Sequence, residues 1–133
     1  MPEAGGAGGE RTGSLGDRLR RWVRSRRVIV HDESMLPTLW PGDRLLVDRS
    51  AFAERAPRPG EIVVVRDPEV QDRLLVKRVE RVRSDPGSAP AVFVVGDNAE
   101  RSRDSRAFGP LAPAALVGRA YRCYAPAERR RDL

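Results

Sequence analysis

Six short apolar runs, separated by proline, glycine and aspartate, are the feature that most limits what this sequence can fold into. The runs cover residues 27–31, 44–48, 62–66, 74–82, 91–95 and 116–124. Turn-forming residues lie between them, as in Pro41-Gly42-Asp43, Pro59-Gly60 and Asp85-Pro86-Gly87. Runs of strand length with turns between them are typical of antiparallel sheets. The sequence therefore predicts a mainly β fold, built as a single compact domain of short antiparallel strands.

The 133 residues have room for one domain, flanked by two basic ends. Residues 1–14 are Gly-rich and lack large apolar side chains, so we expect a disordered leader. Residues 15–27 carry arginines around a few apolar side chains and could form a short helix. Residues 28–124 would form the folded domain. Residues 125–133 form a basic tail that we expect to be a frayed, solvated end.

The net charge of +6 requires that anionic partners be considered. Aromatic residues make up only 5% of the chain, and no recognition helix is evident, so we do not expect a nucleic-acid partner. A non-enzymatic binding module is the corresponding alternative function. Cys123 and His31 are the only residues of their types. Disulfides within the chain, thiolate metal clusters and multi-histidine metal sites are therefore excluded.

No apolar run approaches the roughly 18 residues that a membrane span needs. The basic segment 15–27 is not followed by the apolar stretch of a secretory signal. We therefore expect a cytoplasmic protein. The basic leader could contact an anionic membrane surface, but such contact is not required for this interpretation.

Lys77 is the only lysine among 25 basic residues, the other 24 being arginine. In the predicted strand 74–82, alternation places Leu75, Lys77 and Val79 on one face. Burial among apolar neighbours disfavours the ammonium form, so a neutral amine could accept a proton near physiological pH. Arginine cannot take that role because it stays protonated. Lys77 is therefore a candidate general base.

Ser34 lies where the chain leaves a predicted strand, a position that could present a hydroxyl and a backbone N–H to a cleft. Further along, residues 94–98 run from another strand into a loop rich in hydrogen-bonding side chains, a suitable support for a base. Each piece alone could be an ordinary turn or solvent loop. Together they suggest a nucleophile, Ser34, with Lys77 as its base.

Five ordered motifs strengthen this interpretation. They are Ser34-Met35 with Pro37-Thr38; Pro41-Gly42-Asp43; Pro59-Gly60-Glu61-Ile62-Val63; Val76-Lys77-Arg78; and Gly96-Asp97-Asn98 with Ser102, Asp104, Ser105 and Arg106. This set resembles the boxes of the type I signal peptidase family over residues 28–124. The resemblance implies a signal-peptidase-like catalytic domain that cleaves a precursor polypeptide after a small residue, with a Ser/Lys dyad and no cofactor or metal.

Carried over by position, the resemblance assigns the residues of the site. Ser34 would be the nucleophile and Lys77 the base. Three residues would support them: Ser102, which orients the lysine, and Asp104 and Arg106, which brace the loop. Walls of the substrate pocket would be Met35 and Pro37. The backbone N–H of Ser34 would donate to the oxyanion.

Asp32 departs from the family pattern, which usually has a small or hydroxyl residue two positions before the serine. An ionised carboxylate accepts hydrogen bonds and cannot donate one to an oxyanion. Within the family, residues 42–47 and 71–78 are most similar to the short proteases that mature nickel-type superoxide dismutase. Alternatives are a general signal peptidase at the membrane, a self-cleaving repressor-like peptidase that cuts at Ala4-Gly5 or Ala7-Gly8, and an inactive binding relative.

Overall fold

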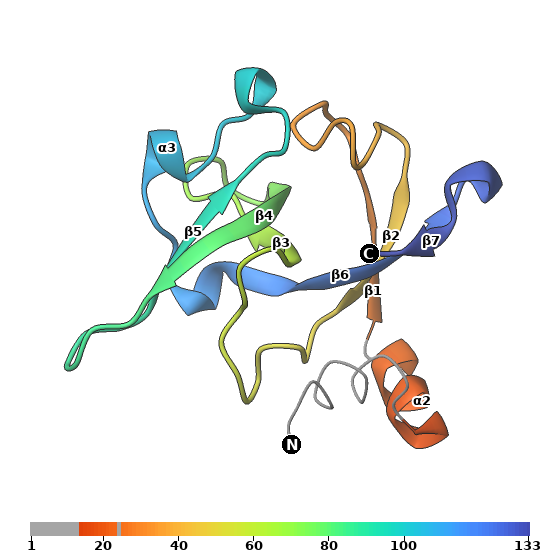
Figure 1. Ribbon diagram of the computed structural model, residues 1–133, viewed down its shortest axis with the longest axis horizontal. Coiled ribbons are helices and arrows are strands. Elements are labelled where there is room, and N and C mark those ends of the chain that lie inside the picture. Colours follow the sequence, from red (N-terminus) through yellow and green to blue (C-terminus); the bar gives the residue numbers. More distant parts are fainter. Residues whose placement is uncertain (1–13, 24) are drawn as a thin grey trace.

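A sheet of seven antiparallel strands organises the residues that this computed structural model describes, 14–23 and 25–133 (Figure 1). The strands are β1 (Ser25–Ile29), β2 (Arg44–Asp48), β3 (Ile62–Arg66), β4 (Leu74–Arg83), β5 (Ala91–Val95), β6 (Leu116–Ala125) and β7 (Arg131–Asp132). The mainly β prediction is confirmed, and the six apolar runs correspond to β1 through β6. Residues 1–13 of the expected leader, with both Ala-Gly pairs, lie outside the described residues.

The long strand β6 joins two halves of the sheet, whose order is β1-β2-β6-β3-β4-β5. Its first part pairs with β3 and its later part with β2, while β7 also pairs with β6. Figure 1 shows β1 and β2 on one side of the molecule and β3 to β5 on the other, with β6 running across from one side to the other. Two apolar clusters form the core. One surrounds Leu45 and Val47 and also includes Ile62 and Val64 of β3, and the other surrounds Val63 and Val94.

Gly118 allows β6 to pass closely against β2 at the junction of the two halves. A Cβ at this position would lie 2.9 Å from Val47 Cγ1 and would overlap the Asp48 carbonyl oxygen. Backbone atoms cannot give way as a flexible side chain can, so a side chain at position 118 would push the strands apart. Glycine is therefore required here for its size.

The helices are short and lie at the margins of the sheet. They are the α-helices α2 (Leu15–Val23) and α3 (Ser105–Phe108) and the 3-10 turns η1 (Ala99–Arg101), η2 (Pro113–Ala115) and η3 (Ala127–Arg129). In residues 14–23 and 25–133, none of these helices has the length and apolar character needed to cross a membrane. Both α3 and η1 lie in the loop after β5, which also carries the predicted support residues.

The C-terminal segment is ordered against the sheet, so the expectation of a frayed tail is wrong. Arg129 Nε donates to Asp43 Oδ1 at 2.5 Å, and the Asp43 side chain is fully buried. The N–H of Leu133 donates to the carbonyl of Tyr121 at 3.0 Å, and the leucine packs on the apolar cluster around Leu45 and Val47. The arginine run suggested a solvated end because the sequence does not reveal the buried carboxylate that Arg129 neutralises.

Candidate active site

Ser34 lies in the turn that follows β1, and only 3% of its surface is exposed. Two backbone hydrogen bonds shape this turn. The N–H of Leu39 donates to the carbonyl of Met35 at 2.9 Å, and the N–H of Leu36 donates to the carbonyl of Glu33 at 3.2 Å. The Ser34 carbonyl accepts the N–H of Asn98 at 2.8 Å, which ties the turn to the loop after β5. The turn is thus held from within and from the other half of the sheet.

Lys77 is buried near the middle of β4, where it pairs with Val63 of β3 and is 1% exposed. Its neighbours Leu75 and Val79 are buried on the same face, and the residues between them are partly exposed. The predicted alternation is therefore correct. Lys77 Nζ donates to Ser102 Oγ at 3.0 Å. Within the described part of the chain, no carboxylate forms a close ion pair with the ammonium group, and no hydrogen bond joins it to Ser34 Oγ.

The three predicted support residues form a continuous chain of hydrogen bonds behind Lys77. Ser102 Oγ donates to Asp104 Oδ2 at 2.6 Å, which leaves its lone pairs free to accept from Lys77. Asp104 Oδ2 also accepts from Arg106 Nη2 at 2.7 Å and from the N–H of Gly96 at 2.9 Å. Burial raises the pKa of the Asp104 carboxyl, but the hydrogen bonds from Arg106 and Ser102 outweigh it and hold that pKa below its usual range. Asp104 is therefore a fixed acceptor for the Ser102 hydroxyl.

Burial is the largest influence on the pKa of Lys77 and lowers it from the usual lysine value. The negative charges of Asp32 and Asp104 raise this pKa, while the positive charges of Arg103 and Arg106 lower it further. Since burial prevails, more of the amine is neutral at a given pH than in an exposed lysine. This property is the one that a lysine general base requires.

Gly96 brings the serine turn and the support loop close together. A Cβ at position 96 would lie 2.6 Å from the Ser34 carbonyl oxygen and would overlap Ser102 Oγ. The backbone of Ser34 and the hydroxyl of Ser102 therefore lie on the same side of a single glycine. Since Ser102 contacts Lys77, the structure brings the predicted nucleophile, base and orienting hydroxyl into one buried neighbourhood.

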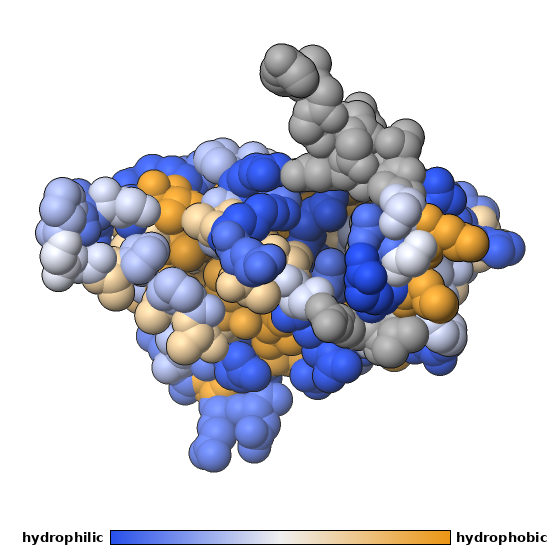
Figure 2. All heavy atoms as spheres, turned by 90° about the horizontal axis from the view of Figure 1, so that it is seen from below, coloured by the Kyte–Doolittle hydropathy of each residue, from blue (hydrophilic) through white to orange (hydrophobic). Residues whose placement is uncertain are grey.

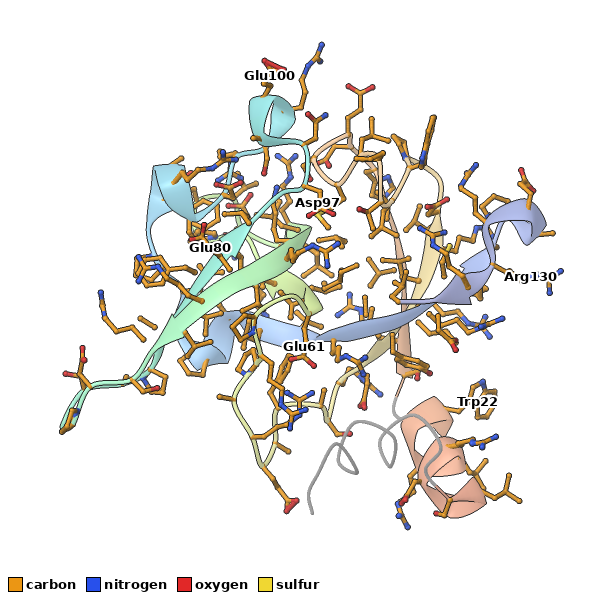
Figure 3. The ribbon with its side chains drawn as sticks, in the orientation of Figure 1. Trp22, Glu61, Glu80, Asp97, Glu100 and Arg130 are labelled. Carbon is orange, nitrogen blue, oxygen red and sulfur yellow. The ribbon has the colours of Figure 1, made fainter. Side chains whose placement is uncertain are left out.

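Asp97 and Arg78 form a brace that the sequence interpretation missed. Arg78 donates to Asp97 through Nε and Nη2, both at 2.8 Å, and through Nη1 to the Gly60 carbonyl at 2.7 Å. Asp97 Oδ2 also accepts Thr38 Oγ1 at 2.5 Å. Figure 3 places Asp97 between the end of β5 and the serine turn. Arg78 received no role in the sequence analysis, and the Gly96-Asp97-Asn98 motif was the signal that could have indicated this contact.

Asp32 contacts the backbone of the predicted nucleophile. Its Oδ1 accepts the N–H of Ser34 at 3.0 Å, and the Asp32 residue itself is exposed. His31 is also exposed. The N–H that the sequence analysis assigned to the oxyanion is thus engaged by a carboxylate of the same turn.

A groove of about 610 Å³ leads to Ser34 between β1 and the start of β4. It is lined by Arg26, Arg27, Val28, Ile29, Val30, His31, Asp32, Ser34, Met35, Asp72, Arg73, Leu74, Leu75 and Val76. Met35 is fully buried and lines this groove, whereas Pro37 is exposed and is not part of its lining. Of the two predicted pocket walls, the structure places only Met35 at the groove.

The groove lies between two strand edges. β1 lies at one end of the sheet, so its outer edge has no neighbour among the described strands. β5 pairs with β4 only from Arg78 onward, which leaves the edge of residues 74–77 unpaired on that side. Unpaired N–H and C=O groups at such edges are ready to pair with an extended peptide.

Comparison with known proteins assigns this arrangement to a family. Residues 19–85 and 88–125 match the family model described as signal peptidase, peptidase S26. Subunit 1b of the mitochondrial ATP-independent inner membrane protease of Arabidopsis thaliana is 38% identical over 108 residues, which cover 68% of this chain and 64% of the relative. The chain thus spans somewhat less than two thirds of that relative.

Two further relatives come from other organisms. A probable signal peptidase I-1 of Synechocystis is 31% identical over 150 residues, covering 84% of this chain and 76% of the relative. Subunit 1 of the mitochondrial inner membrane protease of Xenopus tropicalis is 31% identical over 107 residues, covering 69% of this chain and 64% of the relative. The matched part of this chain includes the serine turn, β4 and the support loop.

Proposed function

Because the chain belongs to the signal peptidase family, peptidase S26, we propose that it is a serine endopeptidase that cleaves a precursor polypeptide, with Ser34 as nucleophile and Lys77 as general base. The observation that carries this proposal is the burial of Lys77. Lys77 is only 1% exposed and donates to a neutral hydroxyl near the serine turn, and burying an ammonium group in this way does not stabilise the fold. A lysine with a lowered pKa in such a place is suited to base catalysis.

The reaction proceeds through an acyl-enzyme. The neutral Lys77 amine takes the proton of Ser34 Oγ as that oxygen attacks the scissile carbonyl carbon. The resulting ammonium returns the proton to the leaving amine, and the peptide C–N bond breaks. Water then attacks the ester with Lys77 again as base, which releases the acid and restores Ser34. Ser102 keeps the amine oriented throughout, because Asp104 fixes its hydroxyl. The Ser34–Lys77 hydrogen bond forms on substrate binding, since such contacts are often long without substrate.

The substrate binds as an extended strand in the groove. Its backbone pairs with the free edges of β1 and of residues 74–77, and its scissile bond reaches Ser34 at the end of the groove. Main-chain pairing of this kind gives affinity without demanding a particular sequence. Selectivity then comes from side-chain positions near Ser34, where buried Met35 limits the space and favours a small residue.

The finer assignment is a protease that acts in the cytoplasm on the precursor of nickel-type superoxide dismutase. It rests on the similarity of residues 42–47 and 71–78 to the proteases that mature that enzyme. Contact of the basic segment with an anionic membrane is a separate part of the proposal, supported by the exposed apolar side chains of α2. Neither part is needed for the peptidase chemistry.

The test incubates the purified protein with two substrates, a precursor peptide with a small residue at the cleavage position and the nickel-type dismutase precursor. Mass spectrometry of the products identifies the bond that is cut. Ser34→Ala should abolish cleavage, and Ser88→Ala, in an exposed turn, should leave it unchanged. Cleavage that persists in Ser34→Ala would refute the peptidase proposal. Cleavage of the first substrate alone would refute only the dismutase assignment.

A further inference from the structure

The N–H of Ser34 is the donor that peptide cleavage needs for the tetrahedral oxyanion, and Asp32 occupies it. The distance from Ser34 N to Asp32 Oδ1 is 3.0 Å, an ordinary hydrogen bond. An N–H directed at a carboxylate is not available to a substrate carbonyl. The negative carboxylate would also repel the oxyanion as its charge develops. In this conformation the site is therefore closed to the proposed reaction.

The Asp32 side chain is free to leave this position. Asp32 lies beyond the end of β1 and is exposed, in contrast to Asp43 and Asp104, which are fully buried. In the described part of the chain, its hydrogen bond to Ser34 is the only one that its side chain makes. Rotation into the adjoining groove would move the carboxylate into solvent and would break no strand pairing.

Asp32 also acts on the base. Lys77 faces the charges of Asp32, Asp104, Arg103 and Arg106, and its Nζ donates to Ser102. Of the two carboxylates, Asp104 is committed to Ser102, Arg106 and Gly96. The Asp32 side chain accepts a hydrogen bond only from the Ser34 N–H among the described residues. Its negative charge favours the ammonium form of Lys77, which cannot accept the serine proton. One exposed carboxylate thus opposes both the oxyanion donor and the base.

We propose that Asp32 is a self-blocking positioning residue, which holds the Ser34 N–H in the resting enzyme and must swing out before a precursor can be cleaved. This inference rests on the proposed peptidase function. It predicts a slow enzyme whose rate is set partly by removal of its own carboxylate. A substrate gains productive binding only by displacing Asp32 from Ser34.

Three variants test the inference with the precursor peptide. Asp32→Ala frees the N–H of Ser34 for the oxyanion. A hydrogen bond to a charged group contributes about 1.5 kcal/mol or more, and a barrier lowered by that amount makes the reaction at least about tenfold faster. We expect kcat/KM to rise about tenfold in Asp32→Ala. Asp32→Asn loses the charge but keeps an oxygen acceptor, so its rate should lie between the two. Glu33→Gln is the matched control, since Glu33 is the neighbouring exposed carboxylate and pairs with Arg101, and its rate should equal that of the wild type.

Two further readouts separate blocking from mere support of the turn. The rise of kcat/KM with pH should begin at lower pH in Asp32→Ala and Asp32→Asn than in the wild type, because the charge that raises the pKa of Lys77 is gone. Hydrogen exchange of the Ser34 amide, followed by NMR, should be faster in Asp32→Ala. Glu33→Gln should show neither change.

The outcomes distinguish this inference from the function on which it rests. An active wild type combined with an equal or slower Asp32→Ala would show that Asp32 supports the turn, and would overturn the inference alone. Unchanged exchange of the Ser34 amide in Asp32→Ala would also overturn it. If the wild type and all variants cleave nothing, the peptidase proposal fails and the inference fails with it.

Discussion

The buried carboxylates of the described residues each accept hydrogen bonds from specific donors. Asp104 accepts from Ser102, Arg106 and Gly96, whereas Asp43 accepts from Arg129 and from the N–H of Trp40. Lys77 differs, because its one hydrogen bond in the described residues goes to a neutral hydroxyl. A buried ammonium without a carboxylate partner is costly. The protein thus reduces the cost of burying its carboxylates and leaves Lys77 easy to deprotonate.

At this scale the sequence could predict Lys77 but not all of its surroundings. Its position in an alternating strand and its status as the only lysine indicated burial and a special role. The contact of Arg78 with Asp97 joins two segments whose relative placement depends on the folded sheet. The contact of Asp32 with Ser34 is local, but it depends on the conformation of the turn, which the residue types alone do not give. Strand alternation shows the face on which a side chain lies, but not the residue that approaches it from another loop.

Arg129 should stabilise the fold through Asp43. Arg129→Ala would leave a fully buried carboxylate without its cationic partner, and we expect a loss of about 2 kcal/mol in the free energy of unfolding, since Arg129 is itself partly exposed. Arg130→Ala is the matched control, because Arg130 is exposed at the neighbouring position (Figure 3), and it should change stability by less than about 0.5 kcal/mol. Urea denaturation measures both. Equal losses in the two variants would show that the tail acts only through its overall charge.

Among the elements, strands β1 to β6 were predictable because each contains an apolar run and lies next to turn-forming residues. The predicted boundaries of β2, β3 and β5 agree with the structure, while β1 begins at Ser25 and β4 and β6 extend slightly further. β7 was missed because two residues, Arg131 and Asp132, carry no apolar periodicity. They pair with β6 through backbone hydrogen bonds, which the side-chain pattern does not reveal.

The helix α2 presents an apolar stripe to solvent. Leu15, Leu19 and Trp22 follow helical spacing and are 81%, 59% and 60% exposed. Figure 3 shows Trp22 pointing away from the sheet, and Figure 2 shows apolar and strongly polar side chains next to each other at the end where α2 lies. A helix of nine residues is marginal by itself, so a surface that covers the stripe would stabilise it. An anionic bilayer suits its arginines.

Binding to vesicles tests this role of α2. We expect the protein to sediment with phosphatidylserine-containing vesicles and much less with pure phosphatidylcholine vesicles. Leu19→Gln should weaken binding about tenfold, because an inserted leucine contributes about 1.5 to 3 kcal/mol. Val70→Gln, at an exposed apolar position outside α2, should bind as the wild type does. Equal binding of Leu19→Gln and wild type would contradict a membrane role for this helix.

At the scale of the whole fold, the described strands form two half-sheets that meet at β6, and the candidate site requires both. The serine turn follows β1 in one half, while Lys77 and the support loop belong to the other. Gly118 lets the halves approach, and Gly96 lets the serine turn and the support loop approach. The order of the motifs along the chain could predict the family and its fold. The groove between the two free strand edges required the topology, which local patterns do not encode.

The pH dependence of cleavage tests the central claim, that buried Lys77 is the base for Ser34, most directly. Only the neutral amine accepts a proton, so kcat/KM should rise with pH through the pKa of Lys77, and its lowered value places this rise below the range of an ordinary lysine. Lys77→Arg should reduce the rate at least about a thousandfold at every pH, because guanidinium keeps the charge but cannot act as a base. Circular dichroism and thermal unfolding confirm that the variant is folded. A folded Lys77→Arg protein that still cleaves the precursor, with the same pH profile as the wild type, would contradict the claim.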